Sequence, residues 1–120
     1  MEAAPSLVSS PPGRISISHE AVAQIVGRVA AEAYGVVGMA ARGARRRLPT
    51  RNRLRQGITV GGSAEEGVTI ELRVVVEYGL NLAEVASTLR NRVRYEVERL
   101  TGLPVAEVDV RIEDVKRSSA

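Results

Sequence analysis

Hydrophobic and polar residues alternate most regularly over residues 68–79, VTIELRVVVEYG, where an apolar residue or Tyr occupies every second position. A period of two predicts a β-strand with one face on a core and the other toward water. The residues expected to face the core are Val68, Ile70, Leu72, Val74, Val76 and Tyr78.

Three shorter segments also have the pattern of strands. They are GRISIS (13–18), GITV (57–60) and VAEVDVRIEDV (105–115). In the last of these, Val108, Val110 and Ile112 alternate with charged residues and are expected to face the core. The segment GGSAEEG (61–67) is typical of a turn between two strands.

Two segments have the period of an amphipathic helix. The first, 19–34, follows Ser18, which is a favourable N-cap, and the second, 81–102, begins with Asn81 and stops at Gly102. The apolar stripe of the first helix contains Val22, Ile25, Val26, Val29, Ala30 and Ala33. The stripe of the second contains Leu82, Val85, Leu89, Val93, Val97 and Leu100.

The order β-α-β-β-α-β predicts an α+β two-layer sandwich, with two helices packed on one face of a four-stranded, mostly antiparallel sheet. A ferredoxin-like, split β-α-β order is the leading topology, with a right-handed helical crossover between the third and fourth strands. We expect a single domain over 13–116, a disordered leader over 1–12 and a frayed tail over 117–120.

Several landmarks together resemble a known family. GRISIS before a capped helix is followed by YGVVGM, VVVEYGLNLAEV and VERLTGLPVAEVDVRIEDV. This order is similar to that of the alkaline shock protein family, the general-stress and envelope-stress proteins of Gram-positive bacteria. The resemblance covers residues 13–116, and its most specific parts are YGLNLAEV, LTGL and VDVRIEDV.

The resemblance implies a small, non-enzymatic, cytoplasmic domain without a cofactor. Some members of the family are held at the membrane by a separate anchoring protein, and others lie in operons linked to lipid metabolism or cell-wall upkeep. The expected function is therefore that of a structural or interaction module of the cell-envelope stress response. Its partners would be proteins near the cytoplasmic membrane, and a peripheral position at the inner face of that membrane is open.

Candidate chemistry is sparse, which agrees with a non-enzymatic function. The chain has no Cys, and its one His, His19, lies at a helix start without an orienting partner in the sequence. The acidic pairs Glu65–Glu66 and Glu113–Asp114 are expected to be solvated at a turn and a strand end. No apolar run approaches the roughly 18 residues of a membrane span. We expect no catalytic, cofactor-binding or metal-binding residue.

Charge gathers in one place, the basic insert 39–56. Residues 42–55 carry seven positive charges although the whole chain has a net charge of +3. The insert contains Arg42, Arg45, Arg46, Arg47, Arg51, Arg53 and Arg55, and MAARGARRRL (39–48) can form a short helix ended by Pro49. Arg supplies 16 of the 17 basic residues of the whole chain, so an Arg in the insert is weak evidence of a binding site. A solvated loop is therefore one interpretation of the insert.

Two other interpretations of the insert remain open. One is contact with an anionic surface, either lipid or an acidic partner protein. The other is a nucleic-acid-binding domain, our alternative function for the chain, since Arg clusters bind phosphates. We do not expect nucleic acid to be the partner, because the chain has no Phe or Trp for base stacking.

A protein interface is the remaining candidate site. Tyr78 and Asn81 flank Gly79 between the long strand and the second helix, where they serve either a tight turn with an N-cap or a contact. Tyr95 lies off the apolar stripe, so it is either half-buried at the sheet edge or part of a protein contact. We also expect a homo-oligomer, because no third layer covers the strand face with Thr69, Arg73 and Val75.

Overall fold

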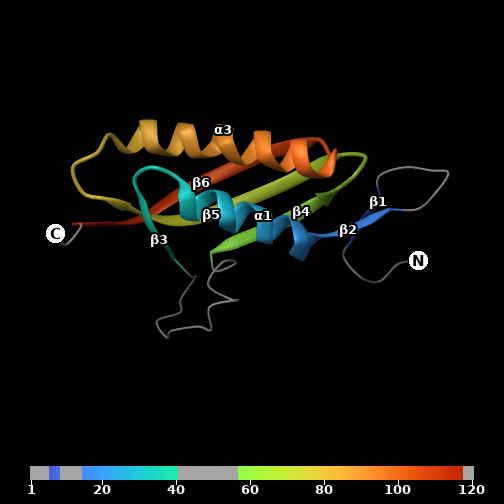
Figure 1. Ribbon diagram of the computed structural model, residues 1–120, viewed down its shortest axis with the longest axis horizontal. Coiled ribbons are helices and arrows are strands. Elements are labelled where there is room, and N and C mark those ends of the chain that lie inside the picture. The colour runs from blue at the N-terminus through green and yellow to red at the C-terminus, as the bar shows by residue number, and fades with distance from the viewer. Residues whose placement is uncertain (1–5, 9–14, 41–56, 118–120) are drawn as a thin grey trace.

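The computed structural model describes residues 6–8, 15–40 and 57–117, which form two layers (Figure 1). Two helices lie on one face of a four-stranded sheet, and a two-stranded ribbon extends from one end. The predicted α+β class with a mostly antiparallel sheet is therefore confirmed. The elements in chain order are β1 (Ser6–Val8), β2 (Ser16–Ser18), α1 (His19–Glu32), β3 (Val36–Met39), β4 (Ile58–Ser63), β5 (Gly67–Glu77), α3 (Leu82–Thr101) and β6 (Val105–Lys116).

Both helices begin at the predicted N-caps. The side chains of Ser18 and Asn81 each accept a hydrogen bond of 3.0 Å from the backbone N–H three residues later. Each cap thus satisfies a donor that has no partner inside its helix. α3 stops at Gly102, whose φ of 74° is left-handed and whose N–H donates to Glu98 O. Glycine adopts this conformation without steric cost, so the helix ends where the sequence predicts.

β5 is the central strand, because every other strand of the main sheet pairs with it. β6 runs parallel to β5 along one edge, beside residues 68–77. β3 and β4 run antiparallel to β5 and share its other edge, β3 beside 74–76 and β4 beside 67–72. A parallel pair needs a long crossover, and α3 supplies it, so β5, α3 and β6 form a β-α-β unit.

The ferredoxin-like strand order is wrong. In that order another strand separates the two strands that the second helix joins, whereas β5 and β6 are direct neighbours. The strand predicted at 13–18 forms as β2, but it pairs with β1 outside the main sheet. β3, which the sequence analysis does not predict, takes its place.

The N-terminal leader expected over 1–12 is not wholly without structure, because Ser6–Val8 forms β1. The other residues of that leader lie outside the described residues. β1 pairs antiparallel with β2, Leu7 opposite Ile17. The hydrogen bonds of β2 therefore go to a segment that precedes it in the chain rather than to the main sheet.

β3 and β4 lie end to end along the same edge of β5, and their ends meet beside Arg73. Ala40 N donates to Arg73 O, and Arg73 N donates to Gly57 O, each at 2.9 Å. Ala40 and Gly57 therefore both lie beside the same residue of β5. Met39 lies in β3, so a helix over 39–48 is wrong at its first residue, and its part from 41 onward lies outside the described residues.

The core lies between β5 and the two helices and is built from aliphatic side chains. The predicted inward residues of β5 from Val68 to Val76 are each at most 2% exposed. Tyr78 was predicted to face the core but is 60% exposed, because the strand ends one residue earlier. The middle of the α3 stripe is buried, whereas Leu82 and Leu100, at its two ends, are exposed. No polar side chain is fully buried within the described ranges.

Candidate interaction surface

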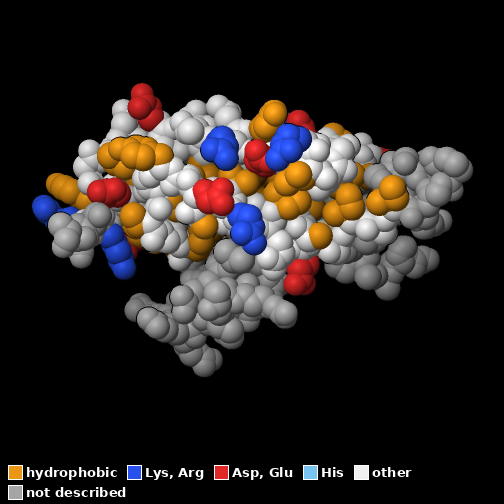
Figure 2. Space-filling view, viewed as in Figure 1, with side chains coloured by type: hydrophobic (Ala, Val, Ile, Leu, Met, Phe, Trp, Pro, Cys, Tyr) orange, Lys and Arg blue, Asp and Glu red, His pale blue; other side chains and the backbone are white. Residues whose placement is uncertain are grey.

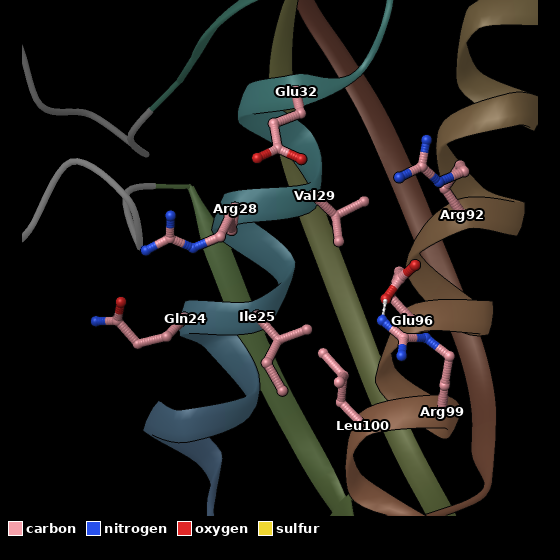
Figure 3. A pocket seen from close by; sticks show the side chains of 9 residues that line it. All are labelled: Gln24, Ile25, Arg28, Val29, Glu32, Arg92, Glu96, Arg99 and Leu100. Carbon is pink, nitrogen blue, oxygen red and sulfur yellow. Dashed lines mark hydrogen bonds and ion pairs between the residues drawn. The ribbon is translucent and has the colours of Figure 1, made fainter.

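A groove of about 430 Å³ lies between α1 and α3 on the helical face (Figure 3). Ile25 and Val29 of α1 and Leu100 of α3 face one another across it (Figure 3). Ile25 is partly buried and Leu100 is 55% exposed, so apolar surface remains open to solvent. The remaining lining residues of this α1–α3 groove are polar: Gln24, Arg28, Glu32, Arg92, Glu96 and Arg99.

The groove exists because short side chains fill the seam between the helices only partly. Val22 and Val26 of α1 are fully buried in the core, while Ile25 and Val29 lie on the side toward α3 (Figure 3). The chain has no Phe or Trp that could bridge the two helices. Exposed apolar side chains consequently lie among Arg and Glu side chains over the helices (Figure 2).

The charges along the groove are only partly paired. Arg99 Nη2 donates to Glu96 Oε1 at 2.7 Å, and this hydrogen bond raises the pKa of Arg99. Arg28, Arg92 and Glu32 make no ion pair with another described residue. Because two guanidinium groups unpaired among the described residues, Arg28 and Arg92, outnumber the one such carboxylate, Glu32, the groove favours a ligand that is apolar on one side and acidic on its flanks.

A second hollow, of about 250 Å³, lies where the chain enters α3. Leu80 and Val85 contribute apolar surface, and Tyr34, which also lines it, is 78% exposed. Gly35 has a φ of +88°, and a Cβ at this position would lie 2.9 Å from Leu80 Cδ1. The glycine therefore allows this turn to close. The other lining residues are Asn81, Glu84 and Thr88.

Asn81 lines this hollow, but its side chain is already engaged as the N-cap of α3. We expect Asn81→Ala to lower the free energy of unfolding by about 1 kcal/mol, because the Glu84 N–H loses its acceptor. Chemical denaturation followed by circular dichroism measures this loss. Asn81→Ser, which restores an oxygen, should recover most of it, and an unchanged stability of the Ala variant would argue against the capping role.

The two tyrosines predicted at a protein interface are exposed but do not line the α1–α3 groove. The Arg117 guanidinium carbon lies 4.9 Å from the centre of the Tyr78 ring, a cation–π contact between the segments that follow β5 and β6. Tyr95 is 61% exposed, so the alternative that the sheet edge half-buries it is wrong. Of the three predicted interface residues, only Asn81 lines one of these two hollows. Their role in an interface stays a prediction.

The sheet face opposite the helices carries linked ion pairs. Arg73 contacts Glu71 Oε2 at 2.8 Å and Glu113 Oε2 at 3.0 Å. Arg111 Nε lies 3.3 Å from Glu71 Oε2 and 3.2 Å from Asp109 Oδ2. The Arg73 and Glu71 side chains are only 16% and 29% exposed, so this part of the network is largely shielded from water, whereas Arg111 and Asp109 lie more open to solvent. Self-association through this face stays a prediction.

The described residues form no cluster suited to catalysis. His19 Nε2 lies 3.3 Å from Gly62 O, which connects the start of α1 to β4. Glu65 and Glu66 are exposed in the turn between β4 and β5, and Glu113 is paired with Arg73. Within the described ranges no three His, Cys, Asp or Glu side chains are grouped to hold a metal ion. No helix there has the length and apolarity to cross a membrane.

The arginines predicted to contact an anionic partner all fall between residues 41 and 56, outside the described residues. The groove residues, in contrast, were missed by sequence reasoning, because Ile25 and Leu100 occupy stripe positions that look like core positions. The available signal was the width of the stripe on α1. Its apolar residues cover both the sheet-facing side and the side toward α3, which is more than one sheet contact requires.

Known proteins similar to this chain form a consistent group. The model of the alkaline shock protein 23 family, described by its cell envelope-related function, matches residues 8–117. The Bacillus subtilis protein YloU is 30% identical over 108 residues, which cover 87% of this chain and 89% of YloU. The Streptococcus pyogenes protein Spy1614 is 29% identical over 113 residues, covering 91% of this chain and 93% of that protein.

A longer relative is a stress response regulator gls24 homolog of Streptococcus pyogenes. It is 26% identical over 113 residues, which make up 92% of this chain but only 63% of the relative. No solved structure matches the chain.

Proposed function

The chain belongs to the alkaline shock protein 23 family, which has a cell envelope-related function, and we propose that it serves this function as a non-enzymatic interaction module. The resemblance seen in its sequence is thus confirmed, and its relatives include a homolog of a stress response regulator. In this proposal the protein acts in the cell-envelope stress response on the cytoplasmic side of the membrane, through protein partners.

The observation that supports this proposal most directly is the α1–α3 groove. Its floor leaves Leu100 more than half exposed, and its lining residues come from both helices. A solvent-facing apolar groove between two helices is a common docking place for an amphipathic helix. Catalysis would instead require an acid, base or nucleophile in the groove with an orienting partner.

The expected partner segment is an amphipathic helix with apolar residues at i, i+3 or i+4, and i+7. Its apolar face would cover Ile25, Val29 and Leu100. Acidic residues on its flanks would pair with Arg28 and Arg92, which have no ion-pair partner in the described part of the chain. A membrane anchor protein with such a segment would bring this chain to the envelope.

The basic insert would add a second, electrostatic contact. Each Arg near an anionic surface contributes about 1 kcal/mol at low salt, and this attraction is screened as salt rises. Peripheral membrane contact and an acidic partner both fit this chemistry. Nucleic-acid binding through the same arginines is the alternative function, and competition with a polyanion distinguishes it.

We expect Leu100→Lys to reduce partner capture at least about tenfold, because burial of a Leu side chain contributes about 1.5–3 kcal/mol. The measurement is affinity capture from detergent-solubilised membranes of the native host, with quantification of each co-purified protein. Leu100 is exposed in the free chain, so the substitution should leave the fold intact.

The matched control is Leu82→Lys, which alters the same residue type on the same helix. Leu82 is 37% exposed and does not line the groove, so this variant should retain the partner. Equal capture by both variants would exclude the groove as the docking site. Capture that a polyanion abolishes equally in all variants would instead support the arginine-dependent alternative.

A further inference from the structure

β6 is a long strand with a free edge. It spans Val105–Lys116, borders the sheet (Figure 1), and pairs with β5 alone among the described strands. The opposite edge of the sheet is made of the shorter strands β3 and β4, and its Gly62 carbonyl contacts His19. A long unpaired edge can pair with a strand of another molecule unless local features block it.

Within the described ranges, side chains block this edge only at its two ends. Val105 N donates to Glu98 Oε2 at 3.0 Å, and Val105 O accepts from Arg94 Nη1 at 2.6 Å. At the other end, Val115 N donates to Asp114 Oδ1 at 2.8 Å. The centre of the strand, between these capped residues, is left open.

The central backbone groups that face away from β5 can be identified from the pairing. Arg73 directs both its N–H and its C=O toward the β3–β4 side, so the alternate, even-numbered residues of β5 direct theirs toward β6. In a parallel ladder, the β6 residue opposite each of these β5 residues directs its own N–H and C=O away from β5, toward the free edge. The residues opposite Ile70, Leu72 and Val74 are Val108, Val110 and Ile112.

We propose that two copies of the chain pair antiparallel through the centre of β6, with Val110 at the two-fold axis. Val110 then lies opposite Val110 of the second copy, and Val108 lies opposite Ile112. These are the residues whose N–H and C=O groups point outward, so each opposed pair exchanges two hydrogen bonds. The same patch serves on both copies, as a two-fold interface requires.

The charges of β6 select this register. Asp109 and Arg111 contact each other within one chain at 3.2 Å but stay about half exposed. With the axis at Val110, Asp109 of each copy also lies opposite Arg111 of the other, in the non-hydrogen-bonded pairs where side chains approach most closely. With the axis one residue earlier, two Asp109 carboxylates would face each other, and one residue later, two Arg111 guanidinium groups would. Like charges directly opposite destabilise a strand pair.

Pairing in this register also covers apolar surface. Val110 and Ile112 are only partly buried in the single chain, and each would gain an aliphatic neighbour from the second copy. The two sheets would join into one sheet with the helices of both copies on the same side. This interface does not involve the α1–α3 groove, so it is independent of the proposed partner docking.

Charge reversal tests the register. Asp109→Arg and Arg111→Asp each place like charges opposite one another, so each should weaken dimerisation about tenfold, which corresponds to about 1.4 kcal/mol. The double variant Asp109→Arg/Arg111→Asp restores opposite charges across the interface and should recover most of the affinity, measured in a Glu71→Gln background because Arg111 also pairs with Glu71. Sedimentation equilibrium over a range of protein concentrations measures the dissociation constant of each.

Two further variants exclude a general effect of charge or folding. Glu65→Arg changes the net charge as Asp109→Arg does, but in an exposed turn, and should leave dimerisation unchanged. Val110→Pro removes an N–H that points to the free edge and should abolish dimerisation while the far-ultraviolet circular dichroism spectrum is retained. A wild-type chain that stays monomeric, or folded single variants without rescue in the double variant, would overturn the proposal.

Discussion

Truncation of Leu72 to Ala should lower the free energy of unfolding by about 3 kcal/mol, the largest effect we expect from a single deletion of core atoms. Leu72 is completely buried, in the central strand of the sheet. The substitution removes apolar contacts and leaves a cavity that the surrounding side chains can fill only in part. Domains of this size are stable by about 5–15 kcal/mol, so the loss is a large fraction of the total.

The measurement is urea denaturation followed by far-ultraviolet circular dichroism, since the chain has no Trp to report by fluorescence. Val75→Ala is the matched control on the same strand, because Val75 lies on the face away from the helices and is only partly buried. Its cost should stay below about 1 kcal/mol. Equal losses for the two variants would contradict the placement of the core on one face of β5.

Substitution of Gly57 by Ala should destabilise the protein by about 2–4 kcal/mol, because strain and a backbone clash add together. Gly57 has a φ of +76°, and a Cβ there would lie 2.6 Å from Ala40 O and 2.9 Å from Arg73 O. These are backbone atoms at the point where β3 and β4 meet β5. These atoms cannot move apart without breaking the hydrogen bonds that Ala40 N and Gly57 O make with the backbone of Arg73.

Gly38→Ala is the internal comparison, since Gly38 lies in β3 and a Cβ at this position would meet nothing within 4 Å. It should be neutral, or stabilise by up to about 1 kcal/mol through a less flexible unfolded chain. Thermal unfolding of both variants gives the comparison. If Gly57→Ala matched Gly38→Ala, the close approach of Ala40, Gly57 and Arg73 would be wrong.

The elements with strong periodicity were predictable from the sequence. The alternation over 68–76 identified the buried face of β5, and the caps Asn81 and Gly102 fixed both ends of α3. The prediction of buried residues failed at the C-terminal ends of β5 and α3. Tyr78 and Leu100 continue their patterns in the sequence, but they lie at or beyond the edge of the layer that could cover them.

Strand order was not predictable, because hydrophobic pattern states which face is buried but not which strand lies next to which. The assignment of 13–18 to the main sheet failed because its backbone hydrogen bonds are made with β1. β3 escaped prediction because VVGM is too short to show alternation. Its position is set by its pairing with residues 74–76 of β5.

The candidate site was predictable only in part. The sequence identified Asn81 as a cap, and its exposed tyrosines are indeed on the surface. The α1–α3 groove depends on how far apart two helices lie, and that distance is set by the side chains of both helices and the sheet together. A single sequence gives the residues on each wall but not the gap between them.

Ala40 and Gly57 both lie beside Arg73. The pairing of β3 and β4 with β5 therefore does not depend on the number of residues between Ala40 and Gly57. Both ends are fixed to one residue of β5, so added or deleted residues between them change no strand register. Their main cost is the entropy of closing a longer loop, about 0.6 kcal/mol for each doubling of its length. We therefore expect insertions between Ala40 and Gly57 to leave the pairing of β3 and β4 with β5 unchanged.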